Sequence, residues 1–108
     1  YRMDHAARMN AEGGILRGLS KLPSEYIRSN VWATFQDDAT AYHTAPFVDH
    51  THLLWASDFP HTDSTWPRSR ELIAEQASHL SEQQHQDIFR DNTARLFNLP
   101  AADASWRM

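Results

Sequence analysis

The sequence has 108 residues, of which 41% are hydrophobic, so it holds enough apolar material for one small domain with a modest core. A formal net charge of −4 at pH 7, with lysine and arginine scattered along the chain, excludes the basic surface that attracts nucleic acids or anionic membranes. The absence of cysteine excludes disulfides and thiolate metal sites, and no apolar stretch approaches the ~18 residues of a membrane span. We therefore expect a cytoplasmic protein without a nucleic-acid or membrane partner.

The first third of the chain is predicted to be mainly helical. Residues 2–12 have a helical pattern, a glycine pair interrupts it, and residues 15–22 resume it until Pro23, before which a helix normally stops. Ser24 is then expected to cap a short helix over residues 24–30. No capping residue precedes the first helix, which indicates a chain cut from a longer one.

Two short apolar segments are predicted to be strands. VWATF, residues 31–35, is β-branched and aromatic and is followed by the polar turn QDD. LLWA, residues 53–56, has the length and bulk of a buried strand. The residues between the strands are expected to be helical in part, with Pro46 limiting the helix. Two strands joined by a helical crossover form the βαβ unit of a parallel sheet.

The part of the chain after the second strand is predicted to be helical. Pro67 suits the first turn of a helix. The inward face of that helix is predicted to comprise Leu72, Ile73, Gln76, Ala77 and Leu80. Ser81 and Gln84 form a capping box that opens a further helix, on which Ile88 and Phe89 face inward.

The order of elements predicts an α/β protein that is mostly helical. A last helix begins at Asp91 and is closed by Pro100, and residues 101–108 are expected to form a flexible tail. Parallel strands are normally buried on both faces, and the chain supplies helices but no neighbouring strands. We therefore expect residues 1–108 to be a single partial domain, either a fragment or a chain whose sheet is completed by other chains.

The motif WASDFPHTDSTWP, residues 55–67, marks the most informative position. The apolar run before it ends abruptly in Ser57, Asp58, Pro60 and His61. An acid and a histidine at this point are typical of a strand end whose side chains serve a chemical site.

Four blocks in this sequence resemble, in the correct order, the amidohydrolase-related TIM-barrel hydrolases, in the branch that includes aminocarboxymuconate-semialdehyde decarboxylase. SDFPH with DSTWP and the closing IFRDNTARLFNL look like the C-terminal end of these proteins, and KLPSEYIRSNVWATFQDD and YRMDH are similar to earlier segments. The resemblance covers residues 1 to about 100. It implies the C-terminal segment of a (β/α)8 TIM barrel, with residues 31–35 as strand seven, residues 53–57 as strand eight and the later helices as the closing wall.

By this resemblance, Asp58 matches the strand-eight aspartate that binds a catalytic divalent metal, usually zinc, and accepts a proton from the metal-bound water. A carboxylate oxygen suits zinc, which lowers the pKa of bound water to roughly 7. The alternative is that Asp58 only caps the turn after the strand. One carboxylate does not hold zinc. The resemblance places the other ligands, an HxH pair after strand one and a histidine after strand five, in sequence absent here, so the chain alone is expected to be inactive.

Two further positions are candidates for contact with a substrate. His61 follows Asp58 at the expected mouth of the site, where it can hydrogen-bond the substrate or orient Asp58, although a loop histidine held by its proline turn is an equal alternative. Arg2 and His5 resemble the arginine and histidine that follow strand six in the family. That arginine reaches a substrate carboxylate in decarboxylase members, sometimes across a dimer interface. An ion pair of Arg2 with Asp4 on the helix surface is the alternative.

Other polar and aromatic residues favour structural interpretations. His50 and His52 precede the second strand, at the stability face of a barrel, and are expected to be surface or packing residues. Asp37 and Asp38 are typical of a turn. Asn92 is expected to begin or cap the last helix. Packing roles are expected for Trp32, Trp55, Trp66 and Phe97.

The sequence thus predicts part of a metal-dependent hydrolase or nonoxidative decarboxylase, a carbon–carbon lyase, that acts on a small carboxylated or cyclic compound. The predicted site has Asp58 as metal ligand and catalytic residue, His61 as catalytic and substrate-binding residue, and Arg2 as a substrate-binding residue. A homo-oligomer is expected. The alternative is a noncatalytic helical module that associates with itself or with a partner, because exposed strands with apolar faces invite pairing.

Overall fold

The computed structural model describes residues 1–10, 19–44, 47 and 49–100, which belong to two compact units. The first unit comprises Tyr1–Val31 and the second Trp32–Met108. The predicted tail at residues 101–108 lies outside the described residues. The single partial domain expected from the sequence stays a prediction.

The first unit contains the helices α1 (Arg2–Met9) and α2 (Pro23–Asn30). α1 confirms the predicted first helix. Of the second predicted helical stretch, residues 15–18 lie outside the described residues and residues 19–22 form no helix. The reason is that Leu22 is already extended, with φ −69° and ψ 151°, as the N-cap of α2.

Ser24 connects the two helices of the first unit instead of capping α2, so the predicted cap was wrong. The Ser24 backbone N–H and hydroxyl donate to the two carboxylate oxygens of Asp4 at 2.8 and 2.6 Å. These two hydrogen bonds hold the pKa of Asp4 below its ordinary value. The N-terminus of α2 is capped by the Glu25 carboxylate, which accepts from the Leu22 backbone N–H at 2.8 Å.

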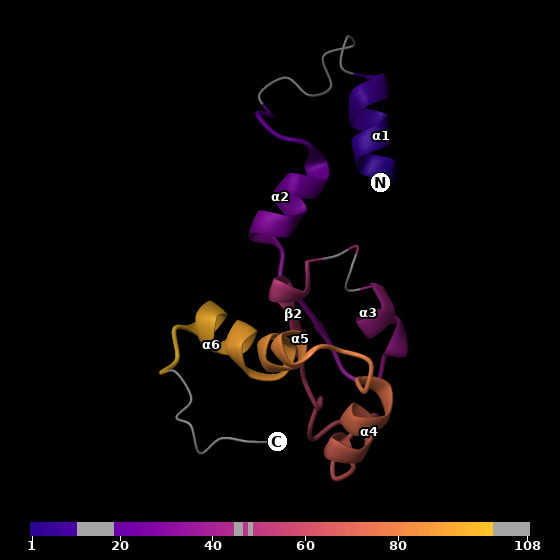
Figure 1. Ribbon diagram of the computed structural model, residues 1–108, viewed down its shortest axis with the longest axis vertical. Helices are drawn as coiled ribbons and strands as arrows, with labels where there is room; N and C mark the ends of the chain where they lie inside the picture. Colours follow the sequence, from indigo (N-terminus) through magenta and orange to yellow (C-terminus); the bar gives the residue numbers. More distant parts are fainter. Residues whose placement is uncertain (11–18, 45–46, 48, 101–108) are drawn as a thin grey trace. The chain divides into compact units, whose positions relative to one another are not determined.

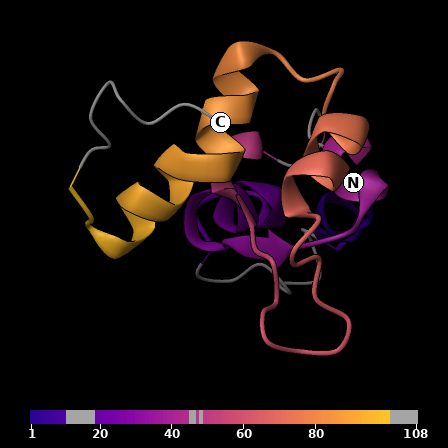
Figure 2. The same ribbon diagram turned by 90° about the horizontal axis from the view of Figure 1, so that it is seen from below.

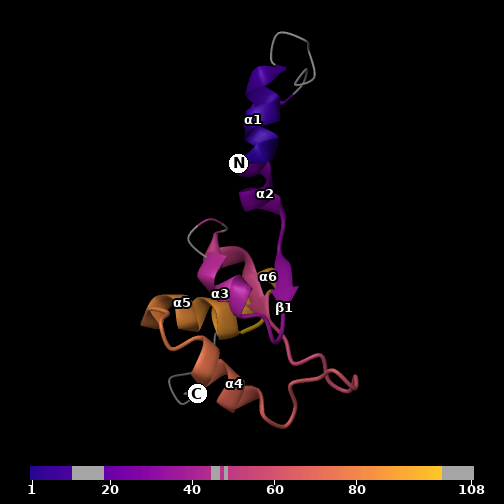
Figure 3. The same cartoon turned by 90° about the vertical axis from the view of Figure 1, so that its right-hand side faces the viewer.

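The second unit contains a parallel two-stranded sheet, as predicted. β1 (Ala33–Phe35) pairs with β2 (Leu53–Trp55), with Ala33 opposite Leu53 and Phe35 opposite Trp55. The crossover includes the expected helix, α3 (Ala39–Thr44). β1 and α3 are visible together in Figure 3.

Both strands are shorter than the predicted segments. The register would place Trp32 opposite His52, but His52 belongs to the short 3-10 helix η1 (His50–His52), whose backbone is not extended. The N-cap of η1 is Asp49, whose carboxylate accepts from the Thr51 backbone N–H at 3.0 Å. The ladder therefore starts only at Ala33 and Leu53.

The helices after β2 are α4 (Ser69–Gln76), α5 (Glu82–Gln86), η2 (Asp87–Asp91) and α6 (Asn92–Phe97). The last three form one helical run, in which η2 has π-helical geometry, so the expected separation into two helices was wrong (Figure 1). The run opens with the predicted capping box of Ser81 and Gln84. No helix among the described residues has the length and apolar character to cross a membrane.

Pro67 lies outside the first turn of α4, which contradicts the prediction. The N-cap is Arg68, and α4 begins at Ser69. The inward face of α4 is otherwise as expected, because Ile73 and Ala77 are buried.

The core of the second unit consists of two adjoining apolar clusters. Tyr42, Ile73 and Ala77 form one of them, which joins α3 to α4 and the residue after it. Leu53 and Ile88 form the other, which joins β2 to η2. Phe35, Trp55, Leu80 and Phe89 pack against both clusters. The inward orientation predicted for Ile88 and Phe89 is thus confirmed.

Asn92 connects the helical run to the start of β2. It is fully buried, and its side-chain N–H groups donate to the backbone carbonyls of His50 and Leu53, both at 2.7 Å. Arg95 donates in turn to the side-chain carbonyl of Asn92. Asn92 begins α6, as predicted, but its side chain bonds the first residue of η1 and the first residue of β2 rather than capping the helix.

We predict that Asn92→Ala lowers the free energy of unfolding by about 2–4 kcal/mol, because the His50 and Leu53 carbonyls each lose the hydrogen bond from the Asn92 amide and a cavity forms. Urea denaturation followed by circular dichroism measures the effect. The control is Asn98→Gly at the C-cap of α6, where Asn98 has a left-handed φ of 51° that glycine also adopts. That variant should change the stability by less than about 0.5 kcal/mol. Equal losses in both variants would contradict the role of Asn92.

Candidate functional site

The carboxyl ends of β1 and β2 lie side by side, because the strands are parallel. The Ala56 backbone N–H continues the pairing by donating to the Phe35 carbonyl at 2.9 Å. The Trp55 indole N–H donates to the Gln36 carbonyl at 3.1 Å, which joins the first residue after β1 to the last residue of β2. Polar segments leave both strands at this edge, with Gln36 and Asp37 after β1 and Ser57 and Asp58 after β2.

The segment from Ser57 to Thr65, which we call the β2 loop, projects from the second unit and is closed at its base (Figure 2). The Ser57 carbonyl accepts from the Ser64 hydroxyl at 2.8 Å and from the Thr65 backbone N–H at 3.1 Å. The Gln36 side-chain amide donates to the Asp63 carbonyl at 3.2 Å, so β1 also supports the loop. The loop is thus attached to both strands.

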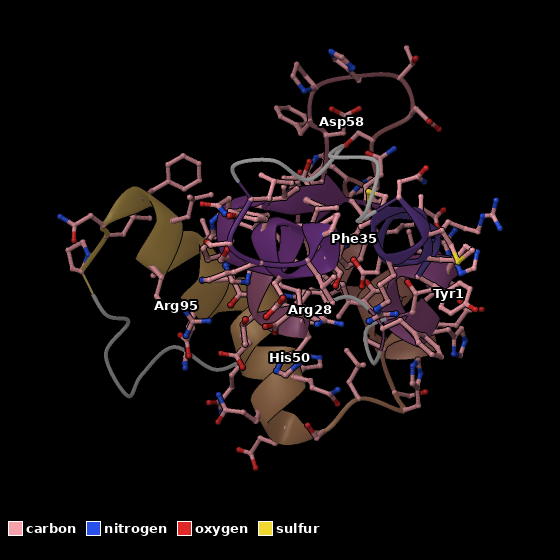
Figure 4. The ribbon with its side chains drawn as sticks, turned by 90° about the horizontal axis from the view of Figure 1, so that it is seen from above. Tyr1, Arg28, Phe35, His50, Asp58 and Arg95 are labelled. Carbon is pink, nitrogen blue, oxygen red and sulfur yellow. The ribbon has the colours of Figure 1, made fainter. Side chains whose placement is uncertain are left out.

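Asp58 has an unusual backbone conformation on this loop (Figure 4). Its φ is 56°, in the left-handed region that non-glycine residues adopt at a cost. The Asp58 carbonyl accepts from the His61 backbone N–H at 2.9 Å. A strained residue at the end of a strand is a common feature of functional sites.

The structure brings the side chains of Asp58 and His61 together. His61 Nδ1 lies 3.3 Å from Asp58 Oδ2, and 48% of the Asp58 side chain and 75% of the His61 side chain are exposed. Among the described residues, no backbone N–H donates to the Asp58 carboxylate, so the turn-capping alternative finds no support. Ser57 supplies the side-chain contact instead, since its hydroxyl accepts from the Phe59 N–H at 3.4 Å.

The donors at this position match a zinc or similar divalent ion only in part. A carboxylate oxygen and an imidazole nitrogen are both suitable zinc ligands. In the described part of the chain, however, no cluster of three or more histidine, aspartate or glutamate side chains is close enough to hold a metal ion. Asp58 can therefore serve as one ligand, and a complete coordination shell does not exist within these residues.

Arg2 and His5 lie on α1 in the first unit, away from the β2 loop in sequence. Arg2 is exposed, and the His5 ring stacks on Tyr1 with ring centroids 6.2 Å apart. Asp4 bonds Ser24, and no ion pair between Asp4 and Arg2 is present among the described residues. The substrate-binding role of Arg2 stays a prediction.

The histidines before β2 and the acids after β1 have structural contacts. His52 packs on Trp32 with ring centroids 4.2 Å apart, and His50 Nε2 lies 3.3 Å from Asp87, as expected for packing residues. The Asp38 carboxylate accepts from the Thr40 backbone N–H at 2.9 Å, which is the expected turn interaction.

Tyr42 is a buried tyrosine close to the acids that follow β1. Burial, followed by the charges of Asp37 and Asp38, raises the pKa of the Tyr42 hydroxyl to about 12. The phenol therefore stays neutral within the core.

The contribution of Gln36 to the β2 loop was not predicted from the sequence, and the packing role predicted for Trp66 was wrong. Trp66 is 64% exposed and meets Phe59, itself 65% exposed, edge to face at 6.2 Å. The predicted packing role was also wrong for Phe97, which is 64% exposed. The sequence did contain an indication that Trp66 would be exposed. Phe59 and Trp66 each precede a proline beside a polar loop, and a residue before proline is disfavoured in a helix that could bury it.

Comparison with known protein families identifies the chain. The family model described as amidohydrolase matches residues 3–99, which include both strands, the β2 loop and the helices that follow. The chain belongs to the amidohydrolase family. A search of curated proteins found no match. Membership of this family agrees with the fold, because two parallel strands with flanking helices are what part of a TIM barrel contains.

We predict that Asp58→Gly raises the free energy of unfolding by about 0.5–1 kcal/mol, whereas Asp58→Ala lowers it. Glycine adopts the left-handed φ without a steric penalty, and the exposed contact with His61 contributes little. Urea denaturation of both variants and the wild type measures the difference. A loss of stability in the glycine variant as large as in the alanine variant would show that the carboxylate holds the loop.

Proposed function

We propose that the chain forms the C-terminal part of a metal-dependent amidohydrolase barrel, in the branch that resembles aminocarboxymuconate-semialdehyde decarboxylase. In this proposal β1 is strand seven, β2 is strand eight, and α4 to α6 close the barrel. The intact protein is a hydrolase or nonoxidative decarboxylase that acts on a small carboxylated or cyclic compound. Family membership and the position of Asp58 at the carboxyl end of a parallel strand support this function.

Asp58 is proposed as one ligand of a divalent metal ion, with zinc favoured by the donor types. Its Oδ2 lies 3.3 Å from His61, and its Oδ1 accepts no hydrogen bond from any described residue, which leaves one oxygen for the metal. A bound divalent metal would supply Lewis acidity and make water acidic at neutral pH. The described residues form no complete ligand cluster. The proposal is therefore that other segments of the barrel supply the remaining ligands and that this chain is inactive by itself.

The pairing of Asp58 with His61 is the observation that carries this proposal. In this proposal His61 orients the Asp58 carboxylate, from which its Nδ1 lies 3.3 Å away, and the closed base of the β2 loop keeps both residues near the strand end. The exposed His61 ring can also donate to or accept from a polar group of the substrate. Arg2 is proposed to bind a substrate carboxylate, because its guanidinium can form two parallel hydrogen bonds with it.

We predict that Asp58→Ala removes activity and lowers the bound metal by at least about tenfold in the protein purified from its natural source. Metal content measured by mass spectrometry, together with turnover of a panel of small aromatic carboxylates and cyclic amides, checks this outcome.

Two control variants separate this effect from a general loss of folding. Asp63→Ala removes an acid of the same exposed loop, whose backbone carbonyl alone is used structurally. His52→Ala removes a histidine that packs on Trp32 before β2. Both variants should keep their metal and their activity. Unchanged metal content and turnover in Asp58→Ala would defeat the proposed role.

A second candidate function, self-association, is favoured by the exposed apolar surface. Large hydrophobic side chains on the described residues are uncovered, including Phe47 at 80%, Phe59 at 65% and Phe97 at 64% exposure. The described sheet has only two strands, so each keeps one edge without a backbone partner. Exposed edges and apolar patches are common sites of association.

We predict that this chain is a dimer or larger oligomer at micromolar concentration. Light scattering after size-exclusion chromatography measures its mass directly. Phe97→Lys, which adds charge to an exposed apolar position, should shift the population towards the monomer, whereas Thr62→Lys on the exposed β2 loop should not. A wild-type chain that elutes as a monomer at its sequence mass and melts cooperatively would contradict self-association.

A further inference from the structure

Two histidines outside the β2 loop form a stacked pair on the surface of the second unit. His43 lies in the last turn of α3, and His79 lies in the segment that joins α4 to α5. The centroids of their rings are 4.5 Å apart, and the ring planes differ by 8°. Both residues are exposed. The two elements that carry them can be followed in Figure 1.

The positions of the two histidines are fixed by the core beneath them. Tyr42, next to His43, and Ala77, two residues before His79, are both 2% exposed and belong to the same buried cluster. The backbone of α3 and the backbone after α4 are therefore held together independently of the two rings. Only the side-chain torsions of the histidines stay adjustable, so little further ordering is needed for both rings to bind one ligand.

The nitrogen atoms of this pair are available for binding. Within the described residues, neither ring takes part in a hydrogen bond or an ion pair, and the pair has no carboxylate close enough to complete a cluster of three ligands. Two neutral imidazoles offer two nitrogen lone pairs, and imidazole nitrogen is a ligand intermediate between hard oxygen and soft sulfur donors. Such donors suit Cu²⁺, Ni²⁺ and Zn²⁺, whereas Ca²⁺ and Mg²⁺ prefer oxygen ligands.

We propose that His43 and His79 form a second metal site, which binds one divalent transition-metal ion through both imidazoles, with water completing the coordination shell. The site shares no residue with the Asp58 loop and does not depend on the proposed enzymatic function. Metal binding in this site requires the stacked rings to rotate about their side-chain bonds until one nitrogen of each points at the same ion. Cu²⁺ should bind most tightly and Zn²⁺ less tightly, as the general order of divalent affinities requires.

Titration of this chain with Cu²⁺ and with Ni²⁺, one metal at a time, tests the proposal. Isothermal titration calorimetry measures affinity and stoichiometry, and electron paramagnetic resonance of the Cu²⁺ form counts the coordinated nitrogens from their hyperfine splitting. We expect one principal site with two nitrogen ligands. His43→Ala and His79→Ala should each weaken Cu²⁺ binding by at least about tenfold, because loss of a direct ligand costs no less than loss of an outer-shell partner.

Two control variants make the test specific to this pair. His5→Ala removes an exposed histidine of α1 that stacks only on Tyr1 among the described residues, and it should keep wild-type affinity. Asp58→Ala should also keep it, which separates this site from the proposed catalytic ligand. Far-UV circular dichroism should be unchanged in all variants, since the substituted rings lie at the surface.

Three results would overturn the proposal. The first is an affinity of His43→Ala or His79→Ala within about twofold of wild type, which corresponds to less than 0.5 kcal/mol of binding free energy. The second is a Cu²⁺ spectrum with a single nitrogen ligand. The third is an equal loss of affinity in His5→Ala, which would mean that any surface histidine accounts for the binding.

Discussion

The second unit depends on the contact between Asn92 and the start of β2. β2 has only three residues, so its ladder with β1 supplies few hydrogen bonds. The buried Asn92 amide compensates by donating to the carbonyls of His50 and Leu53, where the 3-10 helix gives way to the strand. A shift of β2 by one residue would break the two Asn92 hydrogen bonds and move Leu53 and Leu54 out of their buried positions. The register of β2 therefore follows from the helical run that holds Asn92.

The same register decides where the candidate site lies. Asp58 follows β2 by three residues, and the loop that carries it is attached to both strands through Ser57 and Gln36. The left-handed φ of Asp58 costs free energy that the attachment of the loop must offset. A glycine would relieve that cost, and the use of aspartate at this position is consistent with a requirement for its carboxylate.

Short-range patterns predicted much of this structure. The two strands and their parallel pairing follow from apolar runs separated by a crossover, and the capping box of Ser81 and Gln84 is a local sequence signature. The proximity of Asp58 and His61 also follows from sequence, because they lie three positions apart in a tight turn. These features depend on contacts between residues that are close in the chain.

The features that were missed depend on contacts between distant residues. The local sequence predicts Ser24 as a helix cap. In the structure its N–H and hydroxyl groups instead donate to Asp4, twenty positions earlier, because charged carboxylate oxygens are strong acceptors. The local sequence predicts Asn92 as the start of a helix. Nothing in the neighbouring residues indicates its hydrogen bonds with residues about forty positions earlier. Nor does periodicity indicate that η2 would be π-helical, since that geometry changes the hydrogen bonding over a single turn.

The burial of the two strands is unequal, and this bears on both candidate functions. Leu53 and Leu54 of β2 are buried, whereas Ala33 and Thr34 of β1 are exposed. The helices of the second unit thus cover the side chains of β2 and leave those of β1 exposed, and within the described residues each strand keeps one backbone edge at which a further strand can pair. In an amidohydrolase barrel that strand would come from the same domain, and in a self-associated form it would come from a second copy. Self-association through a strand edge and completion of the barrel would therefore use the same edges and exclude one another.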